Sequence, residues 1–256
     1  MRTRYVDIDD RMKDLADQMR GEPEIAEEFH KKYELSWLYH ENALEGLVYT
    51  PQELAAAMAN QPVADVAFVS ALQGIRNHKA ALDLVREEAR AKKPKIHLTL
   101  VRRLNELLGT GAGGKPAPAE FRKDMPLHRA YFHEIAQPAK IPALLQKALD
   151  YTESSEFRSV HVVQAATRFH HGFMQAFPYT ENSGRIARLL VNLLLIHEGY
   201  PLLCIVHSTD RQRYYDSLRF PEAALRDLTL EALDNALTQA EKYFAQAGAA
   251  RRKAAR

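Results

Sequence analysis

Apolar residues recur at helical spacing along most of the 256 residues, and this periodicity constrains the fold more than any other feature of the chain. It predicts helices over about 7–20, 23–45, 51–60, 64–91, 99–108, 141–151, 159–177, 184–198, 212–217 and 228–245. One helix start is well marked, because Thr50, Pro51 and Glu53 have the order of a capping box. The segment 121–138 lacks the spacing and is expected to hold a short β-hairpin. We therefore expect an all-α fold with one small β element.

The composition is that of an ordinary globular protein, with 46% hydrophobic and 27% charged residues. A net charge of +2 is too small to indicate nucleic acid as a partner, and we expect the basic segment 246–256 to be a flexible tail. Cys204 is the single cysteine, which excludes an internal disulfide and a cysteine-based metal site. The sequence shows no signal peptide and no apolar run long enough to cross a membrane. These features favour a cytoplasmic protein.

A polar turn between two of the expected helices has the parts of a phosphate site. Backbone N–H groups at a helix start, aided by the helix dipole, can form a nest for phosphate oxygens. Two arginines three positions apart can grip phosphates, and one carboxylate can hold Mg²⁺. The alternative is an ordinary helix N-terminus with a serine cap and two surface arginines. The candidate residues are Glu181, Asn182, Ser183, Gly184, Arg185 and Arg188.

Other motifs are weaker. The run 109–115 matches the G-x-x-x-x-G-K spacing of a phosphate loop, but it follows a charged helix and precedes a proline. We interpret it as a surface loop. His170 and His171 are adjacent, so they face different sides of a helix and cannot form a metal pair. His128 and His133 lie in the expected hairpin and are predicted to be surface residues.

Residues 177–188, FPYTENSGRIAR, resemble the signature H-P-F-x-[D/E]-G-N-G-R-x-x-R of the Fic (Fido) family of protein adenylyltransferases. The flanking stretches FHHGFMQ and ARLLVNLLLIHEGYP resemble the family's bracketing helices, and 210–218, DRQRYYDSL, is similar to a further family stretch. Residues 39–46, YHENALEG, resemble its inhibitory-helix motif, [S/T]-x-x-x-E-[G/N], with Glu41 where the family has Ser or Thr. The segment 121–142 falls where the family has its target-docking flap.

The resemblance implies a Fic-type helical bundle with a short β-hairpin flap. Its expected parts are an N-terminal helical region (1–95) with an inhibitory-like helix at about 35–46, a Fic core (96–245) and the tail. It also implies a reaction in which AMP passes from ATP, with Mg²⁺ present, to a hydroxyl of a target protein. By this resemblance Glu181 would hold the metal, Arg185 and Arg188 would contact phosphates, and Glu45 would pair with Arg188 and block ATP.

The departures from the signature concern catalysis. The position of the family's proton-accepting histidine is Phe177, which has no acid–base chemistry. The family's Gly-Asn pair is Asn182-Ser183, so the anion nest is altered as well. Both arginines and the carboxylate remain.

Three functions follow. The favoured hypothesis is a catalytically impaired Fic-fold protein that keeps a nucleotide-phosphate pocket and acts by binding or regulation. The alternative is an active nucleotidyl or phosphoryl transferase of a protein hydroxyl, with altered chemistry, in which His170, His171 or Tyr179 serves as base. The third is an interaction module without nucleotide, such as a homodimer through the helix 64–91. The protein partner is not identified by the sequence, and neither nucleic acid nor membrane is expected.

Overall fold

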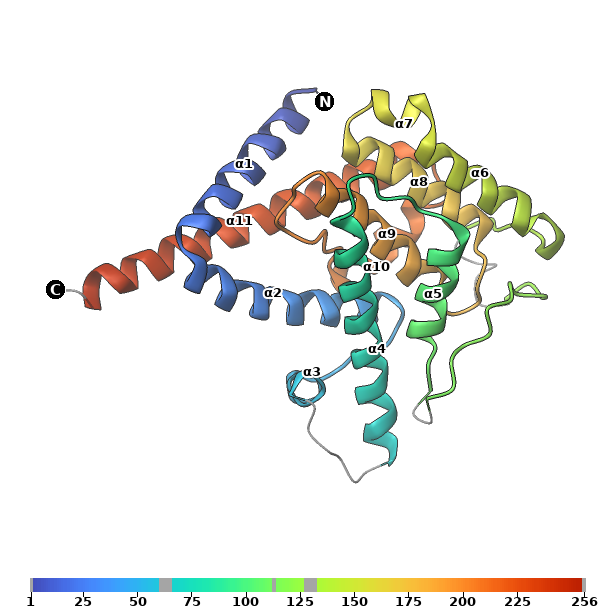
Figure 1. The fold of residues 1–256 in the computed structure, drawn as a ribbon, viewed down its shortest axis with the longest axis horizontal. Coiled ribbons are helices and arrows are strands. Elements are labelled where there is room, and N and C mark those ends of the chain that lie inside the picture. Colours follow the sequence, from blue (N-terminus) through green and yellow to red (C-terminus); the bar gives the residue numbers. More distant parts are fainter. Residues whose placement is uncertain (1, 60–65, 112–113, 127–132, 255–256) are drawn as a thin grey trace.

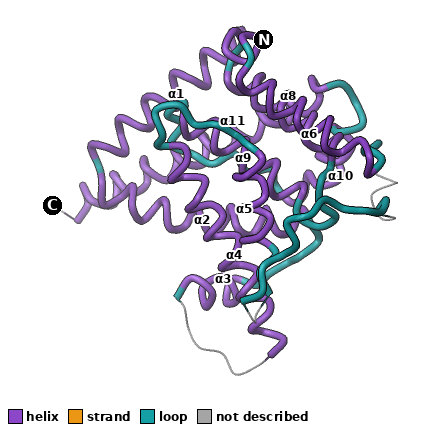
Figure 2. The backbone as a smooth tube through the Cα atoms, turned by 45° about the vertical axis from the view of Figure 1, so that its right-hand side comes forward, coloured by secondary structure: helices purple, strands orange, loops and turns teal. Residues whose placement is uncertain are grey.

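The computed structural model describes residues 2–59, 66–111, 114–126 and 133–254, and these residues form helices joined by loops (Figures 1 and 2). No strand occurs in these ranges. The helices are α1 (Arg2–Gly21), α2 (Pro23–Leu44), α3 (Pro51–Met58), α4 (Val66–Ala89), α5 (Leu98–Leu108), α6 (Ile141–Glu153), α7 (Ser155–Ser159), α8 (Val162–Ala176), α9 (Ser183–His197), α10 (Arg211–Ser217) and α11 (Glu222–Ala254), with 3₁₀ turns η2 (Pro138–Lys140) and η3 (Ser208–Asp210).

The helices expected from periodicity are present, with ends shifted by a few residues. The expected capping box is confirmed: Thr50 Oγ1 accepts from the Glu53 amide at 3.2 Å, and the Glu53 carboxylate accepts from the Thr50 amide at 2.6 Å. The short helix α7 was not predicted, because five residues are too few to show a period. Helix α11 starts earlier than expected and continues to Ala254, so most of the expected tail is helical.

The expected β-hairpin is not seen. The described residues of this segment, 121–126 and 133–138, contain no strand, and 127–132, with His128, lie outside the described residues. Hydrogen bonds to the end of α8 hold the segment instead. The Arg122 amide donates to Pro178 O at 2.9 Å, and the Ala136 amide donates to Gln175 O at 2.9 Å. Two backbone amides of the segment are therefore bonded to the end of α8 and the residues just after it.

Helices α8 and α9 form the centre of the molecule. They pack against each other, while α4 covers α9, and α6 and α11 cover α8. Their inward faces carry fully buried apolar side chains, among them Phe169, Phe173, Ile186, Leu190 and Leu193. Figure 1 shows α11 crossing the molecule, with α1 and α2 beside its C-terminal part. One continuous hydrophobic core runs from α1 to α11.

The C-terminal end of α2 is fixed to the rest of the molecule. Its last carbonyl, Leu44 O, accepts from Arg211 Nε at 2.8 Å and from Tyr215 Oη at 3.2 Å. Gly46 then ends the helix with φ +89°, a left-handed conformation that glycine adopts without strain. Glu45 is thereby held at the helix end, facing α9. None of the described helices is both long and apolar enough to span a bilayer.

Candidate functional site

The site is centred on Arg188, in the second turn of α9. Its guanidinium is 4% exposed and meets two carboxylates from α2. Nε lies 2.7 Å from Glu41 Oε2, and Nη2 lies 2.9 Å from Glu45 Oε1. Nη1 donates to Tyr214 Oη at 3.2 Å. The expected contact between Glu45 and Arg188 is therefore confirmed, and Glu41 and Tyr214 complete what we call the Arg188 clamp.

Two anions share one cation in this clamp, and both partners are out of water. Burial raises the pKa of Glu41 and outweighs the attraction of Arg188, and the negative charge of Glu45 raises that pKa further. Burial lowers the pKa of Arg188, but Glu41, Tyr214 and Glu45 outweigh this, so its pKa lies well above the ordinary value. The guanidinium is thus charged, and each of its nitrogens has a protein partner.

Gly184 lets Glu45 approach the start of α9. A Cβ at position 184 would lie 2.4 Å from Glu45 Oε1, closer than side-chain carbons approach other atoms. Without that Cβ, the carboxylate sits against the first turn of the helix, where backbone N–H groups and the helix dipole attract anions. Glu45 therefore occupies the anion-attracting position at the start of α9.

The remaining charged candidates are more open to solvent. Arg185 is half-buried, and its Nη1 donates to Asn182 Oδ1 at a long 3.4 Å. Its buried Nε has no hydrogen-bond partner among the described residues. Glu181 is exposed at the tip of the turn. No group of three or more His, Cys, Asp or Glu side chains in the described ranges could hold a metal, so any Mg²⁺ here would need ligand phosphates beside Glu181.

Phe177 is the C-cap of α8 and is completely buried. Its φ of +44° is the left-handed conformation that helix C-caps often adopt, usually with glycine. Arg122 holds this backbone in place, since its Nε donates to Phe177 O at 2.8 Å. No sequence pattern identifies Arg122 as a residue of this region. Burial lowers the pKa of its guanidinium. The side chain that stands at the family's histidine position therefore belongs to the core.

The two altered positions of the signature also face inward. Asn182 Nδ2 donates to Asn105 Oδ1 at 3.0 Å, which ties the turn to α5. Ser183 is fully buried, and its Oγ accepts from the Tyr179 amide at 2.8 Å and donates to Tyr179 O at 2.6 Å. These side chains stabilise the turn, and Ser183 does not point toward a phosphate.

The residues weighed as substitute bases have other contacts. His170 is buried, with Nε2 2.9 Å from Tyr214 Oη, and burial lowers its pKa well below the usual value. His171 Nε2 lies 3.0 Å from Phe220 O. Burial raises the pKa of Tyr179 to about 12, so its hydroxyl keeps its proton near neutral pH. None of these three stands at the start of α9 as a poised base.

His133, which was expected at the surface, is buried. Its Nε2 lies 3.0 Å from Met174 O, and its ring centroid lies 6.0 Å from that of Phe177 in an edge-on arrangement. The prediction was wrong because the described residues on both sides of 127–132 contact the end of α8, as the bonds of Arg122, His133 and Ala136 show. No local sequence signal separates this histidine from the others.

Residues 95–195 match the model of the Fic/DOC family. An 87-residue segment is 32% identical to the protein adenylyltransferase Fic of Drosophila willistoni, and an 82-residue segment is 32% identical to that of Drosophila mojavensis. Residues 95–195 therefore contain a Fic/DOC domain, and the matched segments are related to protein adenylyltransferases. The segments cover 34% and 32% of this chain but 17% and 16% of the two fly proteins, so the likeness concerns one part of those longer proteins.

Solved structures with Fic domains share the fold over nearly the whole chain. A Fic-domain-containing signalling protein of Bacteroides thetaiotaomicron aligns with a TM-score of 0.71 at 22% identity, over 91% of this chain and 98% of that one. Fic-1 of C. elegans aligns with a TM-score of 0.76 at 17% identity, over 94% of this chain and 71% of that one. The Fic fold therefore includes the N-terminal helices of this chain as well as residues 95–195.

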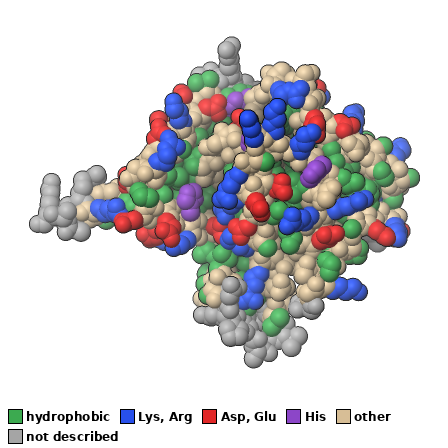
Figure 3. All heavy atoms as spheres, viewed as in Figure 1, with side chains coloured by type: hydrophobic (Ala, Val, Ile, Leu, Met, Phe, Trp, Pro, Cys, Tyr) green, Lys and Arg blue, Asp and Glu red, His purple; other side chains and the backbone are tan. Residues whose placement is uncertain are grey.

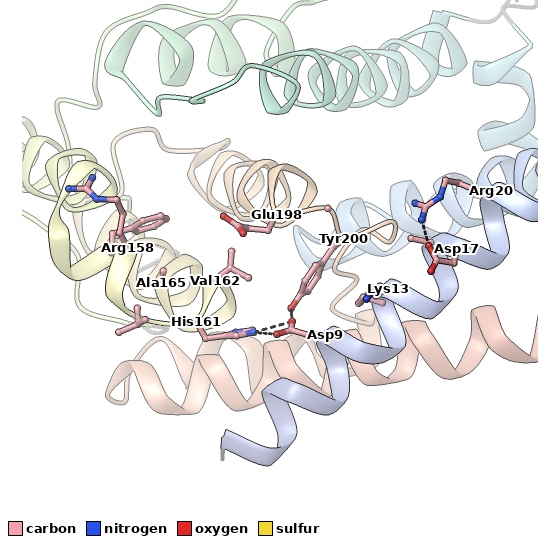
Figure 4. A pocket seen from close by; sticks show the side chains of 15 residues that line it. Asp9, Lys13, Asp17, Arg20, Arg158, His161, Val162, Ala165, Glu198 and Tyr200 are labelled. Atoms are coloured by element: carbon pink, nitrogen blue, oxygen red, sulfur yellow. Dashed lines mark hydrogen bonds and ion pairs between the residues drawn. The ribbon is translucent and has the colours of Figure 1, made fainter.

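A large cavity, about 700 Å³, lies away from the Arg188 clamp, between α1 and the ends of α7, α8 and α9 (Figure 4). Its polar centre is already bonded: Asp9 Oδ1 accepts from Tyr200 Oη at 2.5 Å, and Asp9 Oδ2 lies 3.0 Å from His161 Nε2. Tyr5 stacks on His161 with centroids 4.2 Å apart. These contacts fasten α1 to the core and occupy the Asp9 carboxylate.

Proposed function

We propose that this protein is a Fic-fold regulator with a nucleotide-phosphate site at the start of α9, closed at rest by α2, and with impaired transfer chemistry. The burial of Phe177 carries this proposal. A Fic reaction needs a group at that position that takes a proton from the target hydroxyl, and a benzyl side chain in the core cannot do so. Loss of a positioned general base typically costs about 10²- to 10⁴-fold in rate.

The retained charges support a phosphate ligand. Arg185 and Arg188 place two guanidiniums near the start of α9, where first-turn amides attract anions. Glu181 is exposed beside them and, with ligand phosphates, fits the single-carboxylate coordination that Mg²⁺ accepts. Bound Mg²⁺ would neutralise phosphate charge. Glu45 opposes this binding, since its carboxylate holds the same guanidinium and lies against Gly184.

Calorimetry with MgATP tests the proposal. The double variant Glu41→Gln/Glu45→Gln, which removes both anions of the clamp, is expected to bind MgATP. Adding Arg185→Ala should weaken that binding by about tenfold, the loss of one hydrogen bond to a charged group. Arg213→Ala is the matched control, because Arg213 is exposed on α10 and paired with Glu231. Absence of any binding heat in the opened variant would refute the nucleotide site.

A transfer assay tests the impairment. The opened variant is incubated with MgATP, and AMP adducts on itself or on lysate proteins are sought by mass spectrometry. We expect that no AMP adducts form at rates close to those of active transferases.

One observation favours a second candidate, an active transferase with altered chemistry that modifies a protein hydroxyl. The His133 imidazole lies edge-on to Phe177, from a segment that corresponds to the target-docking flap by resemblance. If transfer is detected, His133→Gln should abolish it, whereas His171→Gln should not.

For the regulator, we propose that the partner is a protein and that the setting is cytoplasmic. On the face drawn in Figure 3, basic and acidic side chains are intermingled and not gathered into one basic patch. Such a surface offers little of the electrostatic attraction on which nucleic-acid binding depends. A pull-down with tagged protein, with and without MgATP, would identify the partner.

A further inference from the structure

All three nitrogens of the Arg188 guanidinium are bound by protein atoms. Nε donates a hydrogen bond to Glu41 Oε2, Nη2 donates to Glu45 Oε1, and Nη1 donates to Tyr214 Oη. The side chains of Arg188, Glu41 and Glu45 are 4%, 1% and 6% exposed. A phosphate that is to bind the edge of the guanidinium formed by Nε and Nη2 must therefore displace a carboxylate.

The two carboxylates hold Arg188 from different parts of α2. They are four residues apart, so they lie on the same face of the helix. Glu45 is the C-cap residue of α2, directly before the turn at Gly46. Glu41 lies one turn inside α2, and its position is fixed by the packing of neighbours such as Leu38 and Leu44, both fully buried.

We propose that Glu41 is a second, independent latch on Arg188, so that moving Glu45 alone does not open the site to a triphosphate. This inference rests on the proposed nucleotide site. A Ser or Thr at position 41, as in the motif that this segment resembles, would offer a neutral hydroxyl. Glu41 instead offers Nε a carboxylate with a full negative charge. Hydrogen bonds to charged groups are roughly twice as strong as neutral ones.

The opening that this latch requires is larger than a side-chain rotation. The last turn of α2 must withdraw as a unit. The hydrogen bonds that Arg211 Nε and Tyr215 Oη donate to Leu44 O hold that turn against α10. A ligand or partner that loosens the contact between α2 and α10 would release both carboxylates together.

Chemical labelling of Arg188 tests the latch without any nucleotide. Phenylglyoxal reacts with accessible arginines, and the adduct at Arg188 is quantified by mass spectrometry in Glu41→Gln, Glu45→Gln and the double variant. Both single variants should label within about twofold of the unsubstituted protein, and the double variant about tenfold faster, the change expected when a charged hydrogen bond is lost. Glu34→Gln is the matched control, since Glu34 is a buried carboxylate of α2 that pairs with Arg86 and Lys79.

Two results would overturn the latch: equal labelling of Glu45→Gln and the double variant, or no increase in the double variant. If Glu41→Gln does not fold, Glu41→Ser takes its place in every arm. Calorimetry with MgATP on the same proteins separates the two proposals. Fast labelling of the double variant without MgATP binding supports the latch and refutes the nucleotide site.

Discussion

The two sides of the site differ in what their side chains do. On the α2 side, charged residues meet at the Arg188 clamp, with two carboxylates on one buried guanidinium. On the side of the turn between α8 and α9, the residues that depart from the Fic signature face the protein interior: Phe177 fills the core, Asn182 bonds α5, and Ser183 closes the turn. The two arginines of the proposed phosphate site are present, whereas the residues at the altered positions make structural contacts.

The packing of the turn carries a conformational cost. A non-glycine residue in the left-handed region costs roughly 1–2 kcal/mol, and Phe177 adopts that conformation. Burial of an aromatic ring and the bond from Arg122 to its carbonyl compensate for this cost. The clamp, by contrast, gains little from burying charges, because desolvation offsets most of their attraction. A gain in stability accounts for the buried side chains of the turn, but it does not account for the buried charges of the clamp.

The largest expected effect is at the clamp. Arg188→Met removes the shared cation and leaves Glu41 buried without its partner, which should cost about 3–5 kcal/mol of unfolding free energy. Urea denaturation measures this loss. The triple variant Arg188→Met/Glu41→Gln/Glu45→Gln should recover at least half of it, since no buried charge remains. A loss below about 1 kcal/mol in the single variant would contradict the buried clamp.

At the turn, Phe177→His should lower stability by about 1–3 kcal/mol, because a polar ring enters a fully buried apolar position. It should not produce AMP transfer, since the imidazole would lie in the core. Phe220→His is the control: Phe220 is 59% exposed, and its replacement should change stability by less than about 0.5 kcal/mol. Transfer activity in Phe177→His would show that this position faces the site.

A smaller loss is expected for Ser183→Ala. It leaves the buried Tyr179 amide without its acceptor, which should cost about 1–2 kcal/mol in a denaturation experiment. Ser159→Ala removes a similar bond, from Ser159 Oγ to Glu156 O, at an exposed position and should be nearly neutral. Equal effects of the two substitutions would mean that Ser183 does not stabilise the turn.

The smallest effect is a pH dependence near the clamp. Burial, and then the neighbouring His207, lower the pKa of His40 to about 4, and its Nδ1 accepts from the Ser208 amide at 3.1 Å. Because the folded-state pKa lies below the unfolded one, this bond contributes stability above about pH 6.5 and loses it as the pH falls toward 4. We expect a loss of about 1 kcal/mol or less for this partly exposed group. His40→Gln should remove that part of the slope in urea midpoints measured between these pH values.

Sequence patterns located most of the helices, because each carries an apolar stripe of sufficient length, and Thr50 and Glu53 marked a helix start that the structure confirms. The contact of Glu45 with Arg188 followed from the family resemblance. The expected hairpin and the surface position of His133 were wrong, because long-range contacts with the end of α8 decide that segment. Arg122 was missed for the same reason, since its partners are backbone carbonyls that no side-chain pattern reveals.

The sequence by itself determined the helical periodicity, the family signature with its altered positions, and the charges available at the start of α9. Only the tertiary structure decided that Glu41 joins Glu45 on Arg188 and that Phe177 points into the core. The reason is physical: periodicity is a local property of the chain, whereas the direction of a buried charge or ring depends on helices that are distant in sequence and adjacent in space.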